Sequence, residues 1–455
     1  MTKYKGLNEY CAMPGQWYKQ GIRFSHFLVS CFCLVVLLPA GLRAADEIKS
    51  GETLDLGRCI TIALKNHPTV LGAVGSLKAS QSRVNEARAN YYPQVSALSS
   101  YSRNYAQGPS TTALSGLSGS SYFNEYQDSL NLNQTLIDFG KRSAQVDVQA
   151  LGADASRADL DNTLSQIILG VKQAYYGILQ ARQSRDAYSE TVVQFQQHLD
   201  QAKRFYEVGT KPKIDVTNAE VDLSQAKLNL LKAENGLRIA RITLNNAMGV
   251  PGAPGYEVKD TAGYQDYPID LETALKRGYE ARPDLASAKA NREAAGRSVD
   301  LAQTGYYPVL SGNAAYGWSG QNYPLDKEWT LGATLNFPLF SGFLTKSQVE
   351  EARANLEVAR ANEEFIRQGI RFDIEQAYSN LTQAREGIVL AEVTVKQAKE
   401  NRELALGRYA AGVGNTIEVT DALVTEINAK TSYITALYDF HLAVASLEKA
   451  MGVKQ

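Results

Sequence analysis

The residues of this chain that could do chemistry together lie in a segment of sixteen residues that occurs twice. The copies are YEVGTKPKIDVTNAEV at 206–221 and YAAGVGNTIEVTDALV at 409–424, with seven identical positions at a spacing of 203. In the second copy Glu418 and Asp421 are three residues apart, so a helix would present both carboxylates on one face. Such a pair either concentrates negative charge in a narrow passage or is an ordinary solvated pair that complements a helix dipole.

The rest of the sequence shows no pattern of residues that indicates catalysis. Gly412 and Gly414 do not form a phosphate loop, because no strand precedes them. No nucleophile is paired with a base. The four histidines are scattered and have no partner at metal-ligand spacing: His26, His67, His198 and His441. We therefore expect no enzyme, no bound metal and no cofactor.

Composition and the first residues indicate an exported protein. The 47 basic and 48 acidic side chains predict no nucleic-acid partner. Basic residues precede an apolar run at 27–40, and GLRAAD follows it. This is typical of a secretory signal peptide cut near Ala44, with a transmembrane anchor as the alternative. The remaining chain has 42 basic and 47 acidic residues and a single cysteine, Cys59, so packing rather than a disulfide must stabilise it.

The chain consists of two related halves. We divide it into a signal peptide (1–44), a first repeat (45–250), a linker (251–268) and a second repeat (269–455). Twelve extra residues in the first repeat fall in the Gly/Ser-rich segment 108–121, which predicts an exposed loop. The recurring motifs, at spacings of 203 or 215, are Pro68 and Pro283, Tyr91-Tyr92-Pro93 and Tyr306-Tyr307-Pro308, Leu132-Asn133 and Leu335-Asn336, and Ala247-Met248-Gly249-Val250 and Ala450-Met451-Gly452-Val453.

Long heptad patterns predict two α-helical hairpins. Apolar residues, many of them alanine, keep a spacing of four and three over 160–206 and again over 377–398. A seven-residue repeat of this length is typical of a coiled coil. The first long helix, about 141–208, would measure roughly 100 Å at 1.5 Å per residue. Each copy of the duplicated segment is then the turn of one antiparallel hairpin, with Gly209 or Gly412 in the left-handed conformation at the helix end.

Each half also contains two predicted antiparallel strands of roughly ten residues, about the length that spans a bilayer when tilted. There the apolar period changes to two, as in Ala333, Leu335, Phe337 and Leu339. Four strands cannot close a membrane barrel and leave open edges in lipid. The sequence therefore predicts that several protomers pool their strands into one barrel. A soluble four-stranded α+β protein is the alternative, but it leaves the long helices without a partner.

Taken together, these features resemble the TolC-like outer membrane efflux proteins over essentially the whole chain after the signal peptide. The resemblance rests on the two repeats, the strand pairs, the heptad helices and the duplicated turns. It implies an α+β membrane protein that is a homotrimer. Two β-hairpins per protomer would contribute to a 12-strand barrel in outer membrane lipid, and the helical hairpins would form a periplasmic tunnel. It also implies a passive exit duct for a tripartite efflux pump or a type I secretion system.

The resemblance implies roles for four residues at the turns. Tyr409 and Asp215 would share a hydrogen bond that holds neighbouring hairpins shut, and Glu418 and Asp421 would ring the tunnel entrance. One departure stands out, because the family has an arginine where this chain has Gly414. We therefore expect the closed entrance to be either looser or held differently here, and Lys211 occupies the equivalent position of the first repeat.

Exposed, duplicated turns at the end of a rigid coil also suit a docking partner. We expect a periplasmic adaptor, and through it an inner-membrane pump, to contact six residues: Gly209, Thr210, Lys211, Gly412, Val413 and Gly414. Two other classes of protein remain open. A specific porin or receptor would need many more strands, and a periplasmic coiled-coil adaptor would carry β modules that this sequence lacks. The sequence does not specify the exported cargo.

Overall fold

A computed structural model describes residues 48–109, 118–260 and 263–453 of the chain, all within one compact unit. The predicted signal peptide, 1–44, lies outside the described residues. Among the helices of the described part, none is long and apolar enough to cross a membrane.

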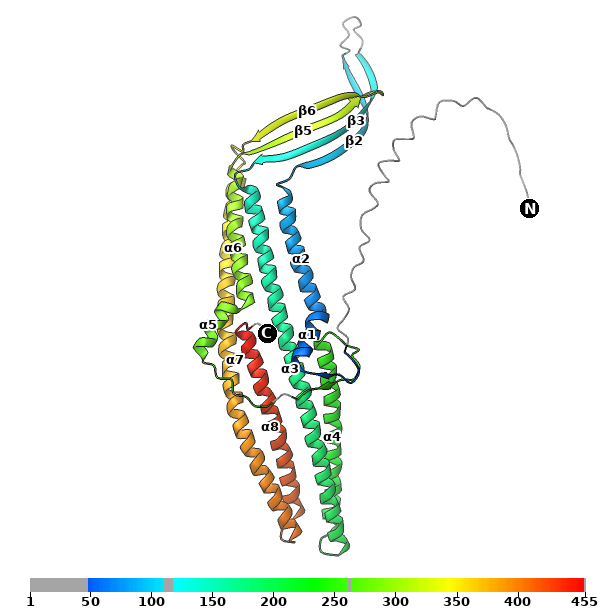
Figure 1. The fold of residues 1–455 in the computed structure, drawn as a ribbon, viewed down its shortest axis with the longest axis vertical. Helices are drawn as coiled ribbons and strands as arrows, with labels where there is room; N and C mark the ends of the chain where they lie inside the picture. Colours follow the sequence, from blue (N-terminus) through cyan, green and yellow to red (C-terminus); the bar gives the residue numbers. More distant parts are fainter. Residues whose placement is uncertain (1–47, 110–117, 261–262, 454–455) are drawn as a thin grey trace, which may run out of the picture. The chain divides into compact units, whose positions relative to one another are not determined.

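The same order of elements occurs twice along the chain (Figure 1). The first set is α1 (Leu56–Asn66), α2 (Pro68–Ala89), β2 (Gln94–Pro109), β3 (Ser118–Ile137), α3 (Lys141–Glu207) and α4 (Lys213–Ala247). The second set is α5 (Leu271–Ala281), α6 (Pro283–Gln303), β5 (Val309–Gly320), β6 (Asp326–Asn336), α7 (Leu344–Ala410) and α8 (Thr416–Ala450). Two short parallel strands, β1 (Thr53–Leu54) and β4 (Glu257–Val258), pair with each other, and a 3₁₀ turn, η1 (Thr304–Tyr306), precedes β5.

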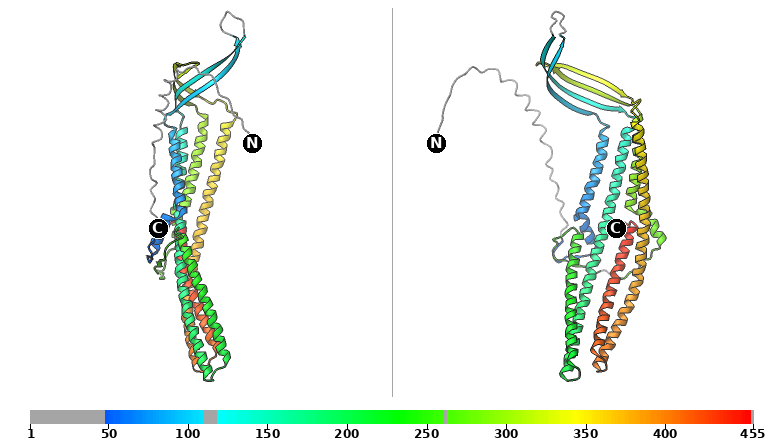
Figure 2. Two further views of the ribbon diagram at one scale, coloured as in Figure 1. Left: turned by 90° about the vertical axis from the view of Figure 1, so that its right-hand side faces the viewer. Right: turned by 180° about the vertical axis from the view of Figure 1, so that it is seen from behind.

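The helical hairpins form as the heptads predict. The helices α3 and α7 have 67 residues each and end within a residue or two of the predicted turns. Each is covered by two shorter helices placed end to end, α2 and α4 along α3, and α6 and α8 along α7 (Figure 1). The strands lie beyond one end of these helices and the hairpin turns at the other (Figure 2). Polar contacts join the first hairpin to the second along α3 and α8, namely Lys172–Glu448, Gln180–Thr435, Glu190–Lys430 and His198–Thr416.

The recurring proline and Ala-Met-Gly-Val motifs meet where the short helices abut. Gly249 follows α4 with a φ of +71°, and a Cβ atom built there would lie 2.8 Å from the Cα atom of His67, the residue before α2. Gly452 follows α8 with a φ of +69°, and its Cβ atom would lie 2.7 Å from the carbonyl carbon of Ala281 in α5. These two glycines therefore allow a close backbone approach that no other residue permits.

The four long strands form one antiparallel sheet in the order β2-β3-β5-β6. The strands of the second half have 12 and 11 residues, close to the prediction, but those of the first half have 16 and 20. The prediction that all of 108–121 is a loop was therefore wrong at both ends. The pairing of β2 with β3 continues to Pro109 and Ser118, because ladder hydrogen bonds satisfy a polar backbone regardless of side-chain composition.

In its helix-side part, one face of this sheet is apolar across all four strands, whereas the next row on that face, Ser99-Asp128-Trp318-Lys327, is largely polar. Two cross-strand rows carry the apolar part, Val95-Leu132-Ala314-Leu331 and Ala97-Leu130-Tyr316-Trp329. The opposite face carries the rows Gln94-Asn133-Asn313-Gly332 and Ser96-Asn131-Ala315-Thr330. Leu331 and Trp329 are each 75% exposed. In the described part of the chain nothing covers the apolar face, so it must meet an apolar environment that the single protomer does not supply.

Candidate functional site at the hairpin tips

Both hairpin turns, here called the tips, are built in the same way. The first tip is 208–212 and the second is 411–415. Gly209 and Gly412 have φ values of +77° and +80°, which confirms the predicted left-handed conformation. The N–H groups of the two residues after each glycine donate to one carbonyl of the preceding helix, that of Phe205 in the first tip and that of Arg408 in the second. The repeated glycine therefore reverses the chain at an identical place in each hairpin.

A direct hydrogen bond joins the two tips. The Nζ atom of Lys211 donates a hydrogen bond of 2.9 Å to the carbonyl oxygen of Gly414. The same ammonium lies 5.1 Å from the ring centroid of Tyr409, within range of a cation–π interaction. Residues 203 apart in sequence are thus linked by one side chain, which is half-buried even though it belongs to an exposed turn.

Tyr409 is fully buried between the hairpins, packed edge-on against the rings of His198 and Phe205. Its hydroxyl has no hydrogen-bond partner among the described residues. The implied hydrogen bond to Asp215 is therefore not formed within this protomer, because the ring is held in an aromatic cluster. Burial, and next the negative charge of Asp215, raise the pKa of Tyr409, while the nearby hydroxyl of Thr416, which makes no well-aligned hydrogen bond to it, opposes this shift. Tyr409 consequently acts here as a packing residue that keeps its proton.

His198 lies beside Tyr409, with 1% of its surface exposed. Its Nε2 atom is 3.0 Å from the hydroxyl of Thr416, the first residue of α8, and its Nδ1 atom is buried without a partner in the described part. Burial lowers the pKa of His198, while the nearby carboxylates of Asp222 and Asp215 oppose this shift. The imidazole is therefore held neutral at the place where α3 and α8 meet.

We expect acid to loosen the contact between the tips through His198. Because its folded pKa lies below the ordinary 6.5, the stability contributed by the neutral ring is complete above that pH and is lost as the pH falls below it. The distance between spin labels at the exposed Val208 and Val413 should widen between pH 7 and pH 5. His198→Gln, which stays neutral, should abolish that dependence, whereas the same widening in His198→Gln would refute the assignment.

The two carboxylates that are predicted at the tunnel entrance, Glu418 and Asp421, differ in their surroundings. Glu418 is 3.3 Å from the guanidinium of Arg408, and its N–H donates to the side chain of Asn415, which caps α8. Both members of that ion pair are substantially exposed, so the pair contributes little stability. Asp421 lies one helical turn further on and is exposed. The structure therefore places both carboxylates on one face of α8, as their spacing predicts, with Glu418 partly neutralised.

The six predicted docking residues fall into two groups. Gly209, Thr210, Gly412 and Val413 are exposed, and Val413 reaches 70% exposure. Gly414 is buried, and Lys211 turns inward toward it. Only the first group is free in this protomer to meet a partner.

Sequence reasoning did not identify the polar groups that join the hairpins. Thr420 donates a hydrogen bond of 2.7 Å to Asp222, and His198 contacts Thr416. A histidine beside the apolar heptad position Leu199 was the available signal, because a polar residue that faces the core needs a partner across the coil.

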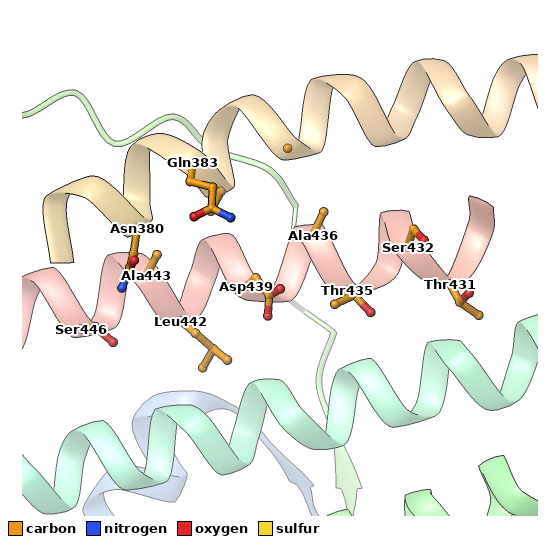
Figure 3. Close-up of a pocket in the computed structure, with 12 residues that line it drawn as sticks. Asn380, Gln383, Thr431, Ser432, Thr435, Ala436, Asp439, Leu442, Ala443 and Ser446 are labelled. Atoms are coloured by element: carbon orange, nitrogen blue, oxygen red, sulfur yellow. The ribbon is translucent and has the colours of Figure 1, made fainter. Parts of the chain in front are cut away.

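A second polar site lies further along the second hairpin, in a groove beside α7 and α8. Asn380 and Gln383 of α7 and Thr435 and Asp439 of α8 line it (Figure 3). Burial raises the pKa of Asp439. No cluster of His, Cys, Asp or Glu suited to a metal ion occurs within the described ranges. The groove offers amides, hydroxyls and one carboxyl, but no arrangement for catalysis.

Known proteins are similar to this chain over nearly its whole length. The sequence model of the outer membrane efflux protein family (OEP) matches residues 59–250 and 275–453. Outer membrane protein TolC of Escherichia coli (strain K12) is 24% identical over 443 residues, which cover 92% of this chain and 86% of that protein. Protein CyaE of Bordetella pertussis is 27% identical over 414 residues, covering 90% and 84%.

Solved structures share the fold. The Campylobacter jejuni CmeC outer membrane channel superimposes with a TM-score of 0.77 at 20% sequence identity, covering 87% of this chain and 85% of that chain. The Neisseria gonorrhoeae MtrE outer membrane channel, solved in its open state, gives a TM-score of 0.74 at 18% identity, covering 87% and 88%.

Proposed function

The chain belongs to the outer membrane efflux protein family, and from that premise we propose that it is the outer membrane exit duct of a tripartite efflux pump or a type I secretion system. The observation that carries this proposal is the four-stranded sheet, which has exposed apolar rows on one face, polar rows opposite them on the other, and an outer strand at each side, β2 and β6. Such a sheet suits a membrane barrel, with lipid outside and water inside.

The open sides of the sheet support assembly into a homotrimer. Four strands per chain cannot close a barrel, and unpaired strand edges are not tolerated in lipid. Three copies of the sheet would give twelve strands, with β6 of one protomer beside β2 of the next. The exposed aromatic side chains at the helix-side end of the sheet, Tyr92, Tyr307 and Phe340, suit the interface between lipid and water.

In this arrangement the helical hairpins extend into the periplasm as a tunnel, and the tips form its entrance. Glu418 and Asp421 would surround that entrance in three copies each. The exposed tip residues Gly209, Thr210, Gly412 and Val413 would contact a periplasmic adaptor, which links the duct to an inner-membrane pump. The duct itself is passive, so neither an enzyme activity nor a cofactor is part of the proposal. The alternative of a periplasmic adaptor is not favoured, because the match is to the channel family.

Purified protein tests the assembly and the entrance together. Native mass spectrometry in detergent should give a trimer, and planar bilayers should show cation-selective channels. Replacing both Glu418 and Asp421 with alanine should lower cation selectivity and weaken block by multivalent cations added on the tip side, because opposed carboxylates in a constriction attract cations. Of the two single variants, Asp421→Ala should lower cation selectivity more than Glu418→Ala, since Glu418 is paired with Arg408.

Glu400→Ala is the matched control, because it removes an exposed carboxylate from α7 away from the tip. A dominant monomer or dimer would contradict the architecture. Selectivity and block that stay at wild-type values in the double variant would show that Glu418 and Asp421 are ordinary helix-start charges.

A further inference from the structure

The side chain of Lys211 in the first tip donates a hydrogen bond to the second tip. We propose that Lys211 is a positioning residue that keeps the two tips of each protomer together, so that the entrance of the channel stays closed until a partner docks. This inference rests on the proposed channel function. Lys211, which the sequence predicted to contact a docking partner, is thereby assigned instead to the contact that holds the two tips together.

The geometry of the ammonium supports this role. An exposed lysine ordinarily keeps its charge in water, yet Lys211 directs its Nζ atom at the Gly414 carbonyl, 2.9 Å away, and over the ring of Tyr409. A hydrogen bond from a charged donor is stronger than a neutral one, and the ring face adds attraction for the same cation. One side chain of the first hairpin thus contacts two residues of the second.

The second tip does not supply such a contact itself. A Cβ atom at Gly414 would lie 2.9 Å from the N atom of Tyr409 and 3.1 Å from the carbonyl carbon of Arg408. Both neighbours are backbone atoms at the end of α7, which cannot move aside cheaply. A side chain at position 414 would therefore require the backbone of this turn to shift. In the observed turn, the long cationic group that bridges the tips comes from the first tip, where Lys211 occupies the matching position 203 residues earlier.

The surroundings allow the Lys211 bond to be removed without unfolding the hairpins. Below it the hairpins share an apolar cluster that includes Phe195, Leu199, Val419 and Leu423. The contacts His198–Thr416 and Asp222–Thr420 also join the two hairpins, and they involve helix residues rather than turn residues. Lys211 acts from the turn itself, so its replacement opens the tips and leaves the core below intact.

Lys211→Met tests the proposal, with Lys213→Met as the matched control. Lys213 lies two residues on and has the same charge, but it is exposed. In planar bilayers we expect Lys211→Met channels to be open more often, with a closed-to-open ratio lower by roughly tenfold per protomer, the effect of removing one charge-assisted hydrogen bond. Lys213→Met should match the wild type, and Lys211→Arg, which keeps a cationic donor, should stay closer to the wild type than Lys211→Met.

Two further measurements separate the possible failures. Native mass spectrometry should give the same assembly for all variants, and labels at Val208 and Val413 should lie further apart in Lys211→Met than in Lys213→Met. If the wild type forms channels but Lys211→Met matches Lys213→Met in both openings and label distance, the positioning role of Lys211 is refuted and the channel function stands. If neither the wild type nor Lys211→Met forms channels while Lys211→Met still separates the tips, the proposed function fails and the tip contact stands.

Discussion

Replacing Gly452 with valine should leave little folded protein, whereas the same substitution at Gly412 should yield a folded chain. Both glycines have a positive φ, so each substitution carries a strain of about 1–2 kcal/mol. At Gly412 nothing lies within 4 Å of the added Cβ atom. At Gly452 the Cβ atom would meet the carbonyl carbon and oxygen of Ala281 at 2.7 and 2.8 Å. The backbone of α5 must then move, and overpacking of this kind adds about 1–3 kcal/mol or more.

The yield of assembled protein and the midpoint of thermal unfolding, followed by circular dichroism, measure this difference. Gly249→Val should behave like Gly452→Val, because its Cβ atom would meet His67 at 2.8 Å. Gly209→Val should behave like Gly412→Val, since its surroundings are open. Equal midpoints for Gly452→Val and Gly412→Val would mean that the contact between α8 and α5 does not limit stability.

Leu331→Arg should prevent assembly in the outer membrane, whereas Thr330→Arg should be tolerated. The two residues are neighbours in the middle of β6, but they lie on opposite faces of the sheet. Leu331 continues the apolar row from Val95, and Thr330 continues the polar row from Ser96. A charge on the lipid face of a barrel costs about 2–4 kcal/mol near the bilayer midplane, while a charge in the water-filled interior costs little.

Fractionation of cells and the amount of assembled protein in the outer membrane would measure this effect. Leu331→Ala serves as the control for loss of the large side chain without a charge. If Thr330→Arg fails and Leu331→Arg assembles, then the two faces are assigned the wrong way round. If both assemble normally, the sheet does not lie in lipid.

The helical part of the fold was predictable because its signal is long and local. Heptads that keep their phase over more than forty residues determine which helices form and which faces meet. Glycine at a helix end then determines where each hairpin turns, and the structure agrees to within two residues at Gly209 and Gly412. The strands were harder, since β2 and β3 owe their extra length to backbone pairing with each other rather than to apolar alternation.

The contacts between the tips could not be predicted, because they join residues about 200 apart in sequence whose types alone do not indicate a partner. Lys211 was assigned to the docking surface as an exposed turn residue, and only the position of the Gly414 carbonyl shows that it turns inward. Tyr409 was assigned a hydrogen bond by family resemblance, whereas its burial between His198 and Phe205 leaves its hydroxyl unpaired in this protomer.

The equal lengths of the two hairpins have a consequence for symmetry. Since α3 matches α7 and α4 matches α8 residue for residue in length, the proposed trimer would present six tips at one level, in a nearly sixfold ring. The chemistry of that ring is only threefold, because lysines at 211 and 213 alternate with glycine at 414 and threonine at 416. A partner with true sixfold symmetry would therefore meet two kinds of site, and could not be bound equally by all of its subunits.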